Sequence, residues 1–133
     1  MLARTDGTGF GLARHSENVI QDIKTNLNGK MGATLFLHKI PILEGASKIL
    51  ENTSIRASLS PSNKNSVRNF KDLNTKNTSL IDILFDPQTS GGIVAVVPTT
   101  NADKLVAHMQ ESIAPKTAII GSLSFDQTGI IVN

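Results

Sequence analysis

The residues best suited to chemistry lie in two glycine-rich segments. The first, TDGTGFGL, spans residues 5–12 and places three glycines just after the carboxylate of Asp6. Glycines let backbone amides approach a ligand closely, and Mg²⁺ binds one or two carboxylates together with phosphate oxygens and water. In a simpler interpretation, Asp6 or Thr8 caps the following helix and the glycines form a turn. Sequence chemistry alone favours this simpler interpretation.

The second segment, LFDPQTSGG, spans residues 84–92. Its Asp86-Pro87 pair is typical of a turn, and Gly91 and Gly92 allow close backbone approach ahead of an apolar run. A structural bend and a loop that faces a cleft are equally compatible with these residues. Neither segment names a reaction by itself.

Composition bounds the possible functions. A chain of 133 residues, 39% hydrophobic, is long enough for one domain, which we place at residues 1–133. It contains no Cys, which excludes disulfides, thiolate nucleophiles and cysteine-ligated metals, and its net charge of +2 is too small to indicate a nucleic-acid partner. His15, His38 and His108 lack zinc-site spacing. No apolar run approaches the roughly 20 residues of a membrane span, and no secretory signal is visible, so we expect a cytoplasmic protein.

The elements that must position the two segments follow from the spacing of apolar residues. Together they predict an α+β fold, in which helices pack against a mixed sheet of about four strands. In the first half of the chain we expect a loop over 5–12, a helix from Leu12 to Asn28-Gly29, a strand within 33–43, and a short helix over 44–52 with Ala46, Ile49 and Leu50 inward. Turns or disorder are expected over 53–79, followed by a helical turn or two over 80–85 and a strand over 93–97 buried on both faces. The chain is then expected to form a helix capped by Asn101, with Ala102, Leu105, Val106, Met109 and Ile113 inward, and a hairpin of strands 118–125 and 130–132 joined by residues 126–129.

Together and in this order, the two segments resemble motifs of selenophosphate synthetase, also called selenide, water dikinase. Thr5–His15 matches the family pattern T-D-[VI]-T-G-F-G-L-x-G-H, and residues 84–92 match L-F-D-P-Q-T-S-G-G. Residues 35–45, 54–63 and 119–121 resemble further strands and loops of the C-terminal half of these enzymes. The resemblance therefore covers essentially the whole chain.

The resemblance implies both a fold and a chemistry. The fold is the α+β C-terminal domain of aminoimidazole ribonucleotide synthetase-like proteins, and the enzymes cleave ATP to AMP and orthophosphate while a phosphoryl group passes to selenide, giving selenophosphate. Asp6 corresponds to a magnesium ligand of the family. Thr8, Gly9, Gly91 and Gly92 are expected near the nucleotide phosphates.

The family's N-terminal half has no counterpart in these residues. Its glycine-rich segment, its Cys or selenocysteine, its essential Lys and its other metal carboxylates are missing, so we assign no catalytic residue. The resemblance implies a homodimeric parent that uses Mg²⁺, ATP and selenide and whose N-terminal half is the partner of this domain. Alone, the domain is expected to be an inactive fragment of a phosphotransferase that binds neither Mg²⁺ nor ATP tightly.

Three residues of the first motif need comment. Gly7 stands where the family has Val or Ile, and gains backbone freedom. Arg14 stands where the family has Gly, and could reach a phosphate, although solvation is the expectation. His15 matches the motif histidine and is expected to pack beside the glycine loop.

A second hypothesis comes from the basic residues between 56 and 78, where the net charge is +4. Such a run is usually a solvated face, but it could also contact phosphates. The chain would then be a free-standing module that binds anions or RNA. The residues concerned are Arg56, Lys64, Arg68, Lys71 and Lys76.

Overall fold

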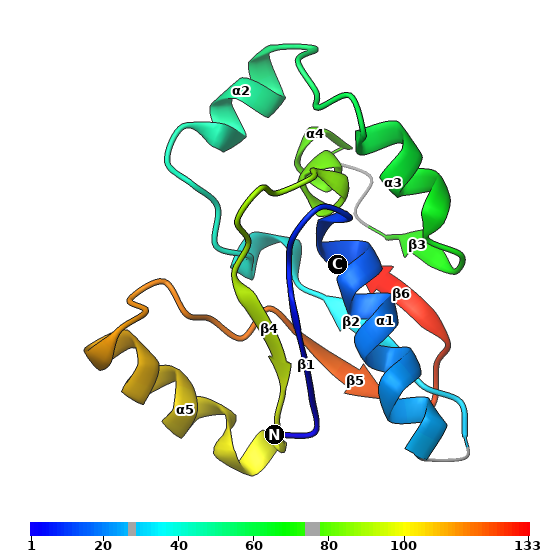
Figure 1. Cartoon of the computed structure of the whole chain (residues 1–133), viewed down its shortest axis with the longest axis vertical. Helices are drawn as coiled ribbons and strands as arrows, with labels where there is room; N and C mark the ends of the chain where they lie inside the picture. Colours follow the sequence, from blue (N-terminus) through cyan, green and yellow to red (C-terminus); the bar gives the residue numbers. More distant parts are fainter. Residues whose placement is uncertain (27–28, 74–77) are drawn as a thin grey trace.

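The computed structural model describes residues 1–26, 29–73 and 78–133. It has an α+β fold in which helices pack against a mixed four-stranded sheet (Figure 1), and this confirms the predicted fold class. Two of its strands run parallel to β6, and β5 is antiparallel to β2. The strand order is β3 (Phe70–Asp72), β6 (Gly129–Val132), β2 (Gly32–Leu35) and β5 (Gly121–Ser124).

Helix α1 (Gly11–Asn26) packs against this sheet and supplies much of the core. Val19, Ile20 and Ile23 fall on one face of the helix and are buried, because their spacing follows the helical period. The predicted helix is thus confirmed, while its expected end at residues 27–28 lies outside the described residues.

The predicted C-terminal hairpin is wrong, because β2 lies between β5 and β6. Gly32, Ala33 and Leu35 of β2 are buried, which suits a central strand. The chain passes from β5 to β6 around the end of β2, where the Gln127 side-chain amide donates to Thr34 Oγ1 at 3.1 Å. The strand expected within 33–43 ends at Leu35, and a 3₁₀ turn, η1 (Leu37–Lys39), follows it.

The polar segment over 53–79 is more ordered than predicted, since it contains α3 (Ser60–Ser66) as well as β3. Ser60 and Asn63 are buried, and the Asn63 side-chain amide bonds to distant carbonyls instead of forming a local turn. The segment is followed by α4 (Thr78–Ile81) and the 3₁₀ turn η2 (Asp82–Phe85), which confirms the predicted helical turns. Residues 74–77 of this segment, including Lys76, lie outside the described residues.

A separate two-stranded ribbon joins β1 (Ala3–Asp6) to β4 (Ile93–Val96) in antiparallel register. Residues 5 and 6 therefore end a strand, which corrects the expected loop. The strand expected to be buried on both faces is also corrected, because β4 alternates between half-buried and exposed residues and Ile93 is 76% exposed.

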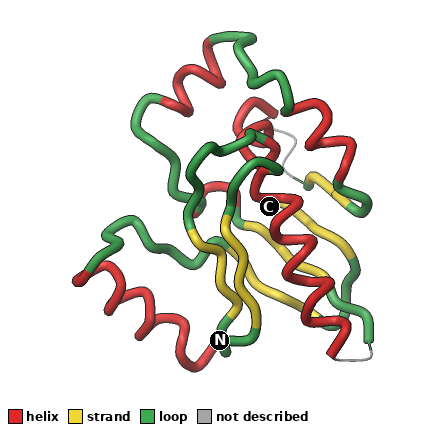
Figure 2. Tube along the Cα trace, viewed as in Figure 1, coloured by secondary structure: helices red, strands yellow, loops and turns green. Residues whose placement is uncertain are grey.

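Two helices of the structure contain no buried residue: α2 (Ala46–Asn52) and α5 (Thr99–Ser112). Ile49, Leu105 and Ile113, which we expected to face inward, are exposed. Pro98, instead of Asn101, occupies the N-cap of α5. Figure 2 shows α5 set apart from α1, with the ribbon of β1 and β4 between them in the view. No helix within the described residues is long and apolar enough to span a membrane.

Candidate functional site

The two glycine-rich segments lie against each other, although more than seventy residues separate them in the sequence. The pairing of β1 with β4 places Asp6 opposite Ile93. Beyond this pair the contact continues, because the Gly7 N–H donates to the Gly92 carbonyl at 2.9 Å and the Gly9 N–H donates to the Gln88 carbonyl at 2.8 Å. The residues that were singled out in the two segments therefore share one part of the surface.

Glycine is required where the two segments touch. A Cβ atom on Gly91 would collide with the backbone carbonyl of Gly7. A Cβ atom on Gly11 would lie 2.5 Å from the Leu84 carbonyl oxygen, and Gly11 also has a φ of +77°, which favours glycine. Gly92, by contrast, has open space around it.

Asp6 is exposed at the end of β1. Thr8 Oγ1 donates to its Oδ1 at 3.3 Å, and no other hydrogen bond or ion pair of the described residues reaches this carboxylate. Arg4, Thr5, Asp6 and Ile93 line a hollow of about 230 Å³. The Asp6 carboxylate is therefore open to a ligand that approaches from solvent.

The described residues could supply only part of a magnesium site. They contain no group of three or more His, Asp or Glu side chains able to hold a metal ion. A single exposed carboxylate still fits Mg²⁺ when phosphate oxygens, water and further carboxylates complete the coordination. Asp6 suits such a shared site, provided that other groups bring the remaining ligands.

His15 packs beside the first glycine loop, as expected, and is 5% exposed. Its Nε2 lies 2.6 Å from the Thr8 carbonyl and its Nδ1 lies 3.2 Å from Thr5 Oγ1. Because a carbonyl oxygen only accepts, Nε2 carries the proton. His15 thus spans the bend that holds Asp6.

Asn63 was missed by the reasoning from sequence, which placed it in a segment of turns. It is 6% exposed, and its side-chain amide donates to the carbonyls of Gly9 at 3.0 Å and of Phe85 at 2.9 Å. One side chain therefore bonds to both glycine-rich segments. The resemblance of residues 54–63 to a family loop ends on this residue and is the signal that could have identified it.

Arg14 is half-buried, and one of its guanidinium nitrogens is engaged by the protein itself. Its Nη1 lies 2.5 Å from Glu17 Oε2 and donates to the Ser66 carbonyl at 3.1 Å. Arg14 therefore connects α1 to α3 as a structural residue.

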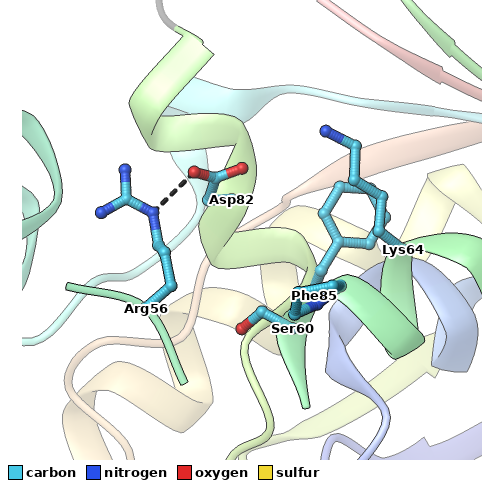
Figure 3. A pocket seen from close by; sticks show the side chains of 6 residues that line it. Arg56, Ser60, Lys64, Asp82 and Phe85 are labelled. Carbon is cyan, nitrogen blue, oxygen red and sulfur yellow. Dashed lines mark hydrogen bonds and ion pairs between the residues drawn. The ribbon is translucent and has the colours of Figure 1, made fainter. Parts of the chain in front are cut away.

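The predicted basic face is partly occupied by structural contacts. Arg56 Nε donates to Asp82 Oδ2 at 2.6 Å, and its other nitrogens donate to the carbonyls of Leu50, Thr53 and Ile55. The Lys64 ammonium lies 5.6 Å from the centre of the Phe85 ring. These side chains border a second hollow of about 170 Å³ (Figure 3). Arg68 and Lys71 are exposed, and Lys76 lies outside the described residues.

Curated proteins similar to this chain are named selenide, water dikinase. The chain is 30% identical over 121 residues to the one from Clostridioides difficile (strain 630) and 30% identical over 131 residues to the one from Carboxydothermus hydrogenoformans. These alignments cover 90% and 98% of this chain but only 32% and 36% of the relatives. The chain thus spans about a third of their length. No protein-family model matches it.

Proposed function

We propose that this chain is the C-terminal part of a selenide, water dikinase. Nearly the whole chain is homologous to about one third of the length of these enzymes. In this role the two glycine-rich segments complete a site for Mg²⁺ and ATP. The observation that carries the proposal is the direct contact between the segments, through the Gly7 and Gly9 amides. The two motifs that carry the resemblance form one structure instead of two unrelated turns.

Asp6 is the metal-binding side chain of the proposed site. Its carboxylate is exposed and accepts one hydrogen bond, from Thr8, so it retains oxygen lone pairs for a cation. When bound, Mg²⁺ would offset the negative charge of the phosphates during phosphoryl transfer. The Thr8 hydroxyl, which donates to Oδ1 at 3.3 Å, would restrain the carboxylate.

The backbone amides of the two segments divide into two kinds. Those of Gly7 and Gly9 already donate to carbonyls of the other segment. Gly91 and Gly92 are half-buried and exposed respectively, and no hydrogen bond of the described residues engages their amides. Gly91 and Gly92 are therefore the residues that offer N–H donors to a phosphate, whereas Gly9 holds the loops together.

The remaining ligands belong to the part of the relatives that this chain does not match. Asp6 alone does not make a magnesium site, and the resemblance places the other metal carboxylates in the N-terminal half. We infer that this half is the partner, that ATP and selenide are the substrates, and that the domain alone is inactive.

A chimera tests the proposal. The chain would follow the first two thirds of the C. difficile relative, and AMP formation from ATP would be measured with and without selenide. We expect selenide-dependent AMP formation by the chimera and none by either part alone. A folded chimera without this activity would contradict the proposal.

The alternative, a free-standing RNA-binding module, makes a different prediction. Binding to single-stranded RNA would weaken steeply with salt and would not respond to ATP or Mg²⁺. The contacts of Arg56 with Asp82 and three carbonyls leave its guanidinium poorly placed for phosphate. Strong RNA binding by the 133-residue chain, with no activity in the chimera, would favour the alternative.

A further inference from the structure

Asn63 forms the most direct side-chain link between the two glycine-rich segments. Its Nδ2 donates to the Gly9 carbonyl of the first segment at 3.0 Å and to the Phe85 carbonyl of the second at 2.9 Å. Both amide hydrogens are used, and both carbonyl oxygens lie within 3.0 Å of one nitrogen. The Asn63 side chain therefore adds a second link to the contact that the Gly7 and Gly9 amides make directly.

Gly9 is held by hydrogen bonds and not by packing. It has a φ of +74°, and a Cβ atom built on it would meet nothing within 4 Å. Its N–H donates to the Gln88 carbonyl at 2.8 Å, and its carbonyl accepts from Asn63. Loss of the Asn63 bond would leave this residue attached on one side only.

The helix that carries Asn63 is itself fixed. Ser66, on the next turn of α3, accepts a hydrogen bond from Arg14 of α1 at its carbonyl and donates its own hydroxyl to the Asn63 carbonyl at 2.7 Å. Asn63 is 6% exposed. Because α1 and α3 are joined in this way, the Asn63 side chain holds the glycine loops in place relative to both helices.

We propose that Asn63 is a positioning residue, which together with the direct backbone hydrogen bonds fixes the distance between the loop of Asp6 and the loop of Gly91 and Gly92. The inference rests on the proposed function, in which these loops face one nucleotide. Asparagine is suited to the position because it offers two donors to two carbonyls. Aspartate has nearly the same shape but only accepts when ionised, so it would repel both oxygens. Serine offers a single donor.

Amide hydrogen exchange on the full 133-residue chain tests the inference without any ligand. The variants are Asn63→Ser and Asn63→Asp, and the matched controls are Asn65→Ser and Asn65→Asp on the exposed side of the same helix. We expect the Gly7 and Gly9 amides to exchange about tenfold faster in the Asn63 variants, as loss of a buried hydrogen bond implies. The Phe36 amide, which donates to Ile120 at 2.9 Å far from the loops, should change less than about twofold.

Equal exchange of Gly9 in the wild type and in the Asn63→Ser variant would overturn the inference. Equal acceleration at Gly9 and Phe36 would overturn it too, because it would show general destabilisation instead of positioning. If Asn63→Asp does not fold, the serine variant decides alone.

Mn²⁺ as a paramagnetic probe separates this inference from the proposed function. In the wild type it should broaden the amide signals near Asp6 and those of Gly91 and Gly92. In the Asn63→Ser variant, broadening at Gly91 and Gly92 should fall about threefold while broadening near Asp6 persists, and unchanged broadening would count against positioning. Because Asp6 alone does not make a magnesium site, absence of any Mn²⁺ effect in the isolated wild type would leave the metal role of Asp6 to the chimera, and the exchange data would still decide the role of Asn63.

Discussion

The four-stranded sheet, with α1 and η2 against it, buries many of its apolar side chains, whereas β4 and α5 contain no buried residue and leave some of their apolar side chains exposed. Val132 and Leu84 are 0% exposed, while Ile93 is 76% and Ile113 is 80% exposed. The first region has a complete core of its own. The second has apolar surface that the described residues do not cover. The glycine loops lie where these regions meet, since they run from β1 to α1 and from η2 to β4.

The largest effect is expected from Phe85, the second residue of the second motif, which lies inside the core. It is 1% exposed, and its ring meets that of Phe70 edge to face at a centroid distance of 5.0 Å. Phe85→Ala should lower the free energy of unfolding by about 3–5 kcal/mol, measured by urea denaturation. Phe125→Ala, at a position 62% exposed, is the control and should cost less than about 0.5 kcal/mol. Similar losses for the two variants would break the contrast between the regions.

The next effect concerns the contact between the loops. Gly91→Ala would force the new methyl group into the Gly7 carbonyl, and such overpacking costs about 1–3 kcal/mol. Gly92→Ala meets open space and should cost less than about 0.5 kcal/mol. Denaturation curves of both variants, with the chemical shift of the Gly7 amide as a local readout, make the comparison. An unchanged Gly7 shift in the Gly91 variant would mean that the loops are not in contact.

A smaller effect is expected at Arg56, which attaches the exposed helix α2 to the core. Its side chain is 24% exposed and joins Asp82 of η2 to the Leu50 carbonyl of α2. Arg56→Ala should cost about 1–2 kcal/mol, mostly through lost hydrogen bonds to a charged group. Thermal unfolding, with Lys48→Ala on the exposed side of α2 as control, measures it. If both variants behave alike, α2 is held by something other than Arg56.

The smallest effect is expected at Ile113, the C-cap residue of α5. Ile113→Ser replaces a side chain that is 80% exposed, so unfolding free energy should change by less than about 0.5 kcal/mol. In the chimera, however, the same change should lower the unfolding free energy further if the part supplied by the C. difficile relative covers this surface. Urea denaturation of both proteins checks the difference. A loss of about 2 kcal/mol in the isolated chain would show that α5 packs more tightly than the structure indicates.

Local periodicity was enough to predict helix α1 of the well-packed region, but it did not predict which apolar residues of β4 and α5 are exposed. Helix α1 was predicted because Val19, Ile20 and Ile23 follow the helical period and do face the core. The apolar run of β4 and the stripe of α5 gave the same signal, but no described residue buries Ile93 or Ile113. An apolar pattern shows that a surface needs covering, and it does not show that this chain covers it.

Prediction from the sequence was also limited because residues far apart in the chain pair with each other. The turn residues 126–129 are typical of a hairpin, yet β2, almost a hundred residues earlier, inserts between the two strands. Likewise, Ser and Asn side chains favour local turns, but Asn63 uses its amide on carbonyls 54 and 22 residues away. The meeting of the two glycine-rich segments followed from no spacing rule, and only the family resemblance indicated it.

The most direct test of the central claim is selenide-dependent AMP formation by the chimera that carries Asp6→Asn. The asparagine amide has the shape of the carboxylate and can still accept from Thr8, so the variant should fold as the parent does. Its rate of AMP formation should fall at least about a hundredfold, because a metal-binding charge that stabilises the transition state is removed. Asp126→Asn, at an exposed position in the β5–β6 connection, is the matched control and should retain full activity. Normal turnover by the Asp6 variant would contradict the assignment of Asp6 to the metal site.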